Sequence, residues 1–135
     1  MGFEKNPYPL LKHAKLLVMT SLWEGLPIAL LEAMSLGIPA VVSDCSSGIR
    51  SIWEIPQKQP SQSSEEPCRW SSCGALIDEM GSSDVSIGYW SETVYELLNN
   101  PMLHERCRAA ARNCADRYNI SEIEKIWKRK LLDST

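Results

Sequence analysis

Two glutamates, Glu24 and Glu32, bracket a mostly apolar stretch of sequence that reads EGLPIALLE. A carboxylate accepts hydrogen bonds in pairs, so it suits the vicinal hydroxyl groups of a sugar. Gly25, which follows the first glutamate, has no side chain and lets a ligand come close to the backbone. The stretch can therefore offer two hydroxyl-binding carboxylates with open backbone between them.

The same stretch predicts a helix that begins directly after a turn. Pro27 suits the first helical position, where its missing N–H costs nothing, and Gly37 suits the C-terminal end. The backbone N–H groups of Gly25, Leu26 and Ile28 belong to the unsatisfied start of this helix. Together with the helix dipole they favour an anion such as a diphosphate.

Glu32 lies five residues beyond Pro27, about 7.5 Å along a helix that rises about 1.5 Å per residue. A nucleotide sugar has hydroxyls at both ends and a diphosphate between them, and this layout matches it. One carboxylate would bind the hexose and the other the ribose. The alternative is purely structural, because the dipole favours a glutamate near a helix N-terminus and a glutamate inside a helix is commonly just solvated.

The elements around this stretch alternate between helix and strand. LLVMTS, residues 16–21, and IPAVVS, residues 38–43, are apolar runs typical of strands buried on both faces of a parallel sheet. Short helices are expected at residues 7–14, with Asn6 as the cap, and at residues 49–54. This alternation predicts an α/β fold, a Rossmann-like parallel sheet with flanking helices.

The second half of the chain is different in character. Residues 56–73 are rich in proline, serine and glutamine and predict a flexible surface loop within the domain. GALI, residues 74–77, is expected to be a short strand. The rest predicts a helical tail, in which Ser121 caps the last helix, residues 121–132.

Length and composition narrow the class of protein. The 135 residues suffice for one compact domain, and a net charge of −3 provides no basic field for nucleic acid. No apolar run approaches the roughly 20 residues of a membrane helix, and the N-terminal residues do not resemble a signal peptide. The five cysteines form no CxxC motif, so we expect reduced thiols in a cytoplasmic protein and no metal site.

The run SLWEGLPIALLEAMSLGIPAVVSDCSSGIR resembles the C-terminal lobe of GT-B glycosyltransferases, specifically the retaining family called GT4 or glycosyl transferases group 1. The family pattern is S-x-x-E-G-[FL]-[GP]-x-x-x-L-E-A-M/L-x-x-G-x-P-V-V-x-[ST]-D. The resemblance is strong over residues 1–54 and looser to the end of the chain. The positions that match the pattern are Ser21, Glu24, Gly25, Leu31, Glu32, Ala33, Met34, Gly37, Pro39, Val41, Val42, Ser43 and Asp44.

The resemblance implies a role for each part of the motif. Glu24 would contact the hydroxyls of the donor sugar in a catalytic role, and residues 25–28 would lie by the sugar and the diphosphate. Glu32 would bind the ribose hydroxyls. Transfer in this family needs no metal and no cofactor, keeps the anomeric configuration, and takes a hexose from a donor such as a UDP- or GDP-sugar to a surface polysaccharide or glycolipid.

The turn DCSSGIR is the next strand-to-helix turn and resembles a variant found among transferases that build surface polysaccharides. Ser46, Ser47 and Gly48 are therefore candidates for lining the same cleft, although Ser46 or Ser47 can equally be a simple helix cap. The family often has a glutamate where this chain has Ser51, so this turn departs from the pattern.

Family members have two Rossmann-like lobes and more than twice this length. We therefore expect residues 1–135 to form an incomplete C-terminal, nucleotide-sugar-binding lobe that lacks the N-terminal acceptor lobe and transfers no sugar alone. The full-length protein would be cytoplasmic, with peripheral association at the inner face of the membrane open to it. Two alternatives remain: a non-catalytic nucleotide-binding or assembly module of the same fold, and a GT-B nucleotide-sugar epimerase.

Overall fold

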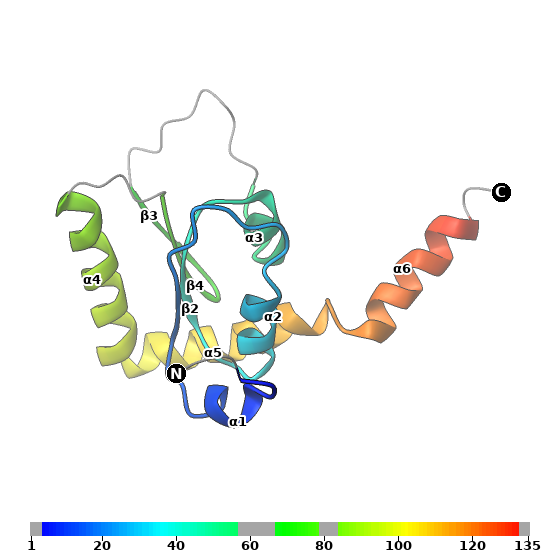
Figure 1. Ribbon diagram of the computed structural model, residues 1–135, viewed down its shortest axis with the longest axis horizontal. Coiled ribbons are helices and arrows are strands. Elements are labelled where there is room, and N and C mark those ends of the chain that lie inside the picture. The colour runs from blue at the N-terminus through cyan, green and yellow to red at the C-terminus, as the bar shows by residue number, and fades with distance from the viewer. Residues whose placement is uncertain (1–3, 57–66, 79–83, 133–135) are drawn as a thin grey trace.

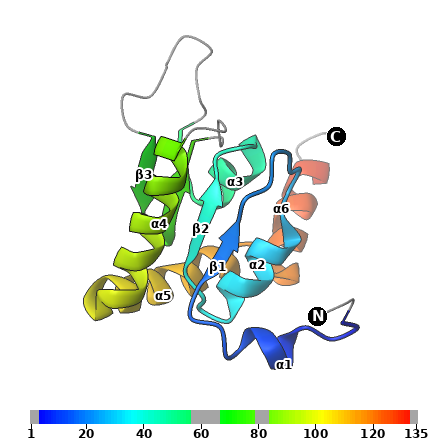
Figure 2. The ribbon, with the colours of Figure 1, turned by 60° about the vertical axis from the view of Figure 1, so that its left-hand side comes forward.

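The computed structural model describes residues 4–56, 67–78 and 84–132. In these ranges the chain forms a four-stranded sheet with helices on both faces (Figures 1 and 2). The elements in chain order are α1 (Tyr8–Leu11), β1 (Leu17–Met19), α2 (Ile28–Ser35), β2 (Ala40–Ser43), α3 (Ser47–Ile52), β3 (Cys68–Ser71), β4 (Gly74–Ile77), α4 (Asp84–Asn99), α5 (Pro101–Asp116) and α6 (Ile120–Leu132).

The sheet has the strand order β1-β2-β4-β3, in which β1, β2 and β4 are parallel. Val41 lies in the centre, opposite Val18 on β1 and Ala75 on β4. Every residue of β2 and β4 is buried, because helices cover both faces of these two strands. The predicted Rossmann-like arrangement is confirmed, and both predicted strands are present in shortened form. Only β2 is buried as predicted: β1 lies at the edge of the sheet, buries none of its residues and leaves Val18 46% exposed.

Alternate residues of the central strands belong to two separate hydrophobic clusters, because successive side chains in a strand point to opposite faces of the sheet. Val42 packs with Leu30 and Met34 of α2 on one face, where α3 and the end of α5 also pack. Val41 packs on the other face with Trp90 of α4, among other residues. Helix α5 runs along one end of the sheet and joins both clusters (Figure 1).

Strand β3 corrects the prediction that residues 56–73 form a surface loop throughout. Cys68–Ser71 pairs antiparallel with β4, and Arg69 lies opposite Leu76. Strand β3 lies at the edge of the sheet and is only partly buried, so its sequence lacks the apolar pattern from which a strand is predicted. Residues 57–66 of the predicted loop lie outside the described residues.

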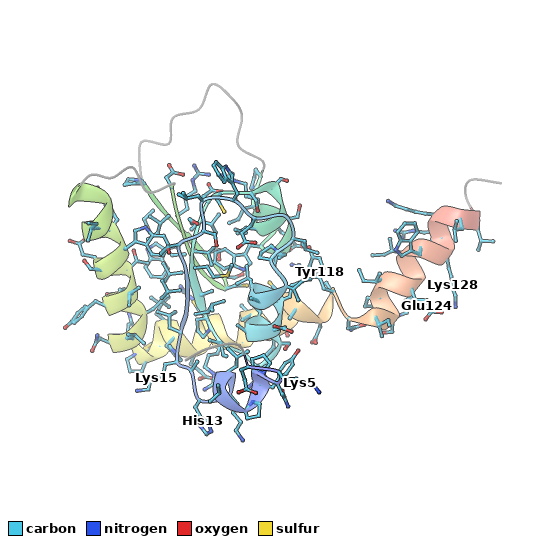
Figure 3. The ribbon with its side chains drawn as sticks, viewed as in Figure 1. Lys5, His13, Lys15, Tyr118, Glu124 and Lys128 are labelled. Carbon is cyan, nitrogen blue, oxygen red and sulfur yellow. The ribbon has the colours of Figure 1, made fainter. Side chains whose placement is uncertain are left out.

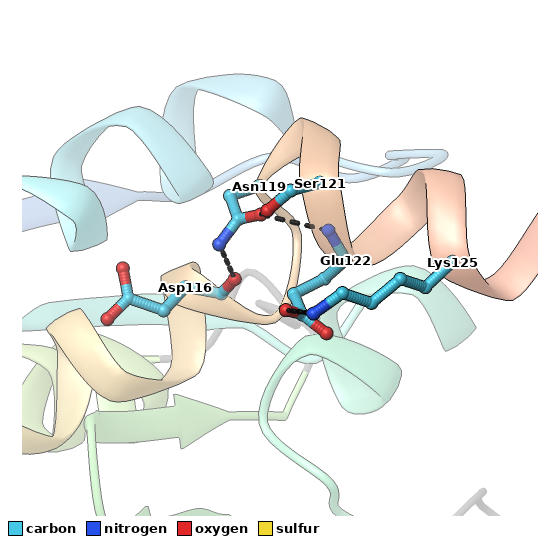
Figure 4. A network of polar contacts seen from close by, with 5 residues as sticks. All are labelled: Asp116, Asn119, Ser121, Glu122 and Lys125. Carbon is cyan, nitrogen blue, oxygen red and sulfur yellow. Dashed lines mark hydrogen bonds and ion pairs between the residues drawn. The ribbon is translucent and has the colours of Figure 1, made fainter.

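The helical tail is confirmed, with one correction at its last helix. The side chain of Asn119 accepts hydrogen bonds from the Glu122 backbone N–H at 3.0 Å and from Ser121 Oγ at 2.6 Å (Figure 4). Asn119 is thus the cap, and the predicted cap Ser121 only supports it. Helix α6 buries none of its residues and projects from the body, with Glu124 and Lys128 paired on its surface at 2.7 Å (Figure 3).

Candidate functional site

Glu24 lies in the turn between β1 and α2, and two serine hydroxyls fix this turn from inside. Ser21 Oγ donates to Glu24 Oε1 at 2.7 Å and orients the half-buried carboxylate. Ser43, the last residue of β2, donates its hydroxyl to the carbonyl oxygen of Ser21. Glu24 is therefore held beside the carboxyl ends of two parallel strands, the edge at which open α/β sheets bind ligands.

The start of α2 offers three backbone N–H groups to a ligand. Pro27, at the N-cap position, provides no side-chain cap. Within the described ranges, no residue accepts a hydrogen bond from the N–H groups of Gly25, Leu26 or Ile28, and all three residues are exposed. Unsatisfied N–H groups at the positive end of a helix form a natural anion site. The structure thus brings together the residues predicted to contact a diphosphate.

The candidate site contains two glycines, Gly25 and Gly48, and their surroundings differ. A Cβ atom on Gly48 would lie 2.0 Å from the carbonyl oxygen of Gly25, so the two turns touch through their backbones. A Cβ atom on Gly25 would meet no heavy atom within 4 Å. The packing of the described residues therefore requires a glycine at position 48 and leaves the space at Gly25 open.

The turn after β2 packs against the backbone of the turn that contains Gly25. Ser46 Oγ accepts from the Ile49 backbone N–H at 3.3 Å, so Ser46 is the cap of α3. Ser46 Oγ also lies 3.3 Å from the carbonyl oxygen of Gly25 and can donate to it. Ser47 is exposed at the first position of α3. Of the three residues predicted to line a cleft, Ser46 and Gly48 contact the turn of Gly25 directly.

Glu32 is half-buried on α2 and has a partner that the sequence did not suggest. The Tyr8 hydroxyl, on α1, lies 3.3 Å from Glu32 Oε1 and donates to it. The negative charge of Glu32 raises the pKa of the Tyr8 phenol above its ordinary value, with smaller contributions from burial and from this hydrogen bond. Tyr8 thereby restrains the carboxylate predicted to bind a ribose. No motif marks Tyr8, because it lies in a short proline-rich helix far from Glu32 in sequence.

A buried ion pair that the sequence analysis missed fixes the turn after β2. Asp44, directly after that strand, accepts from Nε of Arg50 at 2.7 Å and also from the Nη2 group of Arg50. The exposed fractions of the two side chains are 2% and 3%, and Arg50 Nη1 donates to the carbonyl oxygen of Pro56 at 2.5 Å. Asp44 matches the family pattern, and a carboxylate directly after a buried strand was a signal that a cation must lie nearby.

Apolar side chains surround the open turn. Trp23 precedes Glu24 and is 84% exposed, so it adds nothing to the core. Leu22, Leu26 and Ile28 are also exposed, at 57%, 47% and 59%. Such a group of exposed large apolar side chains is uncommon on a solvated surface and is typical of a contact surface.

Residues 4–56, 67–78 and 84–132 offer neither a metal centre nor a membrane-spanning helix. In these ranges, no three His, Cys, Asp or Glu side chains are grouped so that they could hold a metal ion. None of the helices described there combines the length and the apolar character needed to cross a bilayer.

The chain is similar in sequence to known glycosyltransferases. The chain is 48% identical over 52 residues to an uncharacterised glycosyltransferase of Methanocaldococcus jannaschii, a match that covers 38% of this chain and 13% of that protein. It is 44% identical over 55 residues to the lipopolysaccharide 1,6-galactosyltransferase of Salmonella typhimurium, covering 38% and 15%.

A third relative is the Escherichia coli UDP-Gal:alpha-D-GlcNAc-diphosphoundecaprenol alpha-1,3-galactosyltransferase, 43% identical over 44 residues, which are 33% of this chain and 11% of that protein. The chain thus spans only a small part of the length of these relatives. The family model described as "Glycosyl transferases group 1" matches residues 1–114. This chain therefore belongs to the glycosyl transferases group 1 family.

Proposed function

We propose that this chain is the donor-binding part of a retaining hexosyltransferase that uses a nucleoside-diphosphate sugar without a metal ion or other cofactor. The diphosphate would lie over the turn of residues 25–28, with the sugar at Glu24 and the ribose at Glu32. The observation that carries this proposal is the exposed set of N–H groups at Gly25, Leu26 and Ile28, which find no acceptor among the described residues.

The chemistry follows from that placement. In glycosyl transfer the bond between the sugar and the diphosphate breaks, and the leaving diphosphate gains negative charge. Backbone N–H groups and a helix dipole that point at this charge stabilise it more in the transition state than in the ground state. Glu24, oriented by Ser21 at 2.7 Å, can accept hydrogen bonds from sugar hydroxyls and hold the ring in place.

The acceptor is proposed from the relatives. One is named for a lipopolysaccharide and another for a diphosphoundecaprenol-linked sugar, so we propose a surface polysaccharide or glycolipid acceptor. The exposed apolar residues around the turn, Leu22 and Trp23 among them, are consistent with contact to such an acceptor or to another part of the enzyme. The whole protein would act in the cytoplasm, in peripheral contact with the membrane.

We further propose that residues 1–135 bind the donor but do not transfer sugar alone. An acceptor lobe would have to supply the second substrate and close the open turn. Sugar transfer by the purified chain, measured with a radiolabelled donor and a lipid-linked acceptor, would contradict this part of the proposal.

The test of donor binding is an amide-shift NMR titration of this chain with UDP, GDP, ADP and UDP-sugars. We expect shifts at Gly25, Leu26 and Ile28, and weaker binding by the Glu32→Ala variant. The matched control is Glu92→Ala, which removes an exposed glutamate from α4, away from the turn. If the strongest shifts fall outside residues 21–32, or if Glu92→Ala weakens binding as much as Glu32→Ala, the proposed site is wrong.

A further inference from the structure

Two of the five cysteines meet inside the molecule although 41 residues separate them in the sequence. Cys73 occupies the turn between β3 and β4, and Cys114 lies in the last turns of α5. Their Sγ atoms are 2.9 Å apart. Cys73 is fully buried and Cys114 is 9% exposed, so the pair lies at the border between the core and the surface of α5.

We propose that Cys73 and Cys114 form an intramolecular disulfide when the protein meets a small-molecule disulfide. A disulfide bond measures about 2.05 Å, so the two sulfur atoms need to approach by less than about 1 Å. This thiol pair belongs to no part of the donor site, so its oxidation can be tested independently of the proposed function.

The reaction balances with the small disulfide as the only oxidant. The Cys114 thiolate attacks one sulfur atom of the small disulfide, a mixed disulfide forms at Cys114, and one small thiolate leaves. Cys73 then gives up its proton and attacks Cys114 Sγ, which forms the Cys73–Cys114 bond and releases the second small thiol. The protein loses two electrons and two protons, and the small disulfide becomes two thiols.

The surroundings of the two sulfur atoms set the order of these steps. Burial, followed by the contact with Cys114, raises the pKa of Cys73 to about 12, so Cys73 stays protonated at neutral pH. The nucleophile in disulfide exchange is the thiolate, and it must also reach the reagent. Cys114 is the more exposed of the two, so it reacts first and Cys73 resolves the mixed disulfide.

The bond would join two parts of the fold that otherwise meet only by packing. It would tie the β3–β4 turn to α5, and α5 packs against α2, the helix that carries Glu32. Cross-linking residues far apart in sequence restricts the unfolded chain and raises the stability of the folded one. We therefore expect the oxidised protein to unfold at a higher temperature than the reduced protein.

The test is to incubate the folded chain with oxidised glutathione, block the remaining thiols, digest without a reductant and identify the linked peptides by mass spectrometry. The expected result is a Cys73–Cys114 link, a mass lower by two hydrogen atoms, and a higher melting temperature that a reductant reverses. Cys114→Ala should form no such link and should show no gain in melting temperature on oxidation.

Cys107→Ala is the matched control, because Cys107 is a fully buried cysteine on the same helix. Its effect on Cys73 is only a minor electrostatic one, whereas Cys114 Sγ lies 2.9 Å from Cys73 Sγ. We expect Cys107→Ala to form the link as the wild-type chain does. Cys73→Ala, a second variant, covers the case in which Cys114→Ala does not fold. A wild-type chain that keeps both thiols free, or that links Cys73 to Cys107 instead, would overturn the proposal.

Discussion

The Asp44–Arg50 pair gives the sharpest prediction of stability. Arg50→Met keeps much of the length of the side chain but removes the cation. Asp44, 2% exposed, then loses both of its hydrogen bonds from the guanidinium group. A buried carboxylate without a partner still has the free-energy cost of desolvation, but no attraction to a cation offsets that cost.

The expected loss in the free energy of unfolding is about 3–5 kcal/mol, the usual cost of removing one partner of a buried ion pair. Against a total stability of about 5–15 kcal/mol, such a loss brings the domain close to unfolding. With a urea m value of about 1–3 kcal/mol per M, the unfolding midpoint should fall by at least about 1 M. The effect should change little with salt, because the pair is shielded from solvent ions.

The assay is urea unfolding followed by circular dichroism, with a control on the surface. Lys128 contacts Glu124 at 2.7 Å on α6, and these side chains are 70% and 59% exposed. Lys128→Met should therefore cost about 1 kcal/mol or less, since exposed pairs contribute little.

A double variant separates the uncompensated charge from lost packing. Asp44→Asn with Arg50→Met removes the buried charge together with its partner, so this variant should be more stable than Arg50→Met alone. If the double variant is as unstable as the single one, the loss comes from packing of the arginine stem, and the reasoning from charge is refuted.

Three further predictions concern the turns and the second glutamate. Gly48→Ala should lower the stability by about 1–3 kcal/mol, because its Cβ would lie 2.0 Å from a backbone oxygen of the neighbouring turn; an unchanged urea midpoint would contradict that contact. Glu32→Gln should lower the pKa of Tyr8 toward its ordinary value, measured by NMR of labelled tyrosine rings, and no change would show that the two side chains do not interact in solution. Because the folded pKa of Tyr8 is raised, its stabilising contribution is present below the tyrosine pKa of the unfolded chain and is lost as the pH rises through the folded value. Gly37→Ala should cost about 1–2 kcal/mol in thermal unfolding, because Gly37 has a φ of +73°, and relief by shortening Arg112 would mean that crowding dominates instead.

The central part of the fold could be predicted because its sequence signals are local. The apolar runs around Val18 and Val41 and the proline and glycine at the two ends of α2 each specify one element without information from elsewhere. Strand β3 could not be predicted, because an edge strand takes its conformation from its neighbour. The residues of Cys68–Ser71 are only partly buried and become a strand by pairing with β4.

In the candidate site, too, some residues could be predicted from local sequence and others could not. Glu24, Gly25 and Glu32 are marked by their spacing, and the structure places Glu24 and Gly25 in one open turn and Glu32 on the helix that follows it. Two supporting contacts, from Tyr8 to Glu32 and from Arg50 to Asp44, form only in the folded chain. A single sequence shows which residues could do chemistry, but it does not show which side chains orient them.

The backbone contact between Gly25 and Gly48 has a consequence for engineering. A designer who wishes to alter the proposed donor site would exchange residues 21–27 for those of a relative. The carbonyl oxygen of residue 25 must then still clear the backbone at residue 48, where no Cβ atom fits. The two turns therefore behave as one transplantable unit, and chimeras should keep residues 21–27 and 43–50 from the same parent.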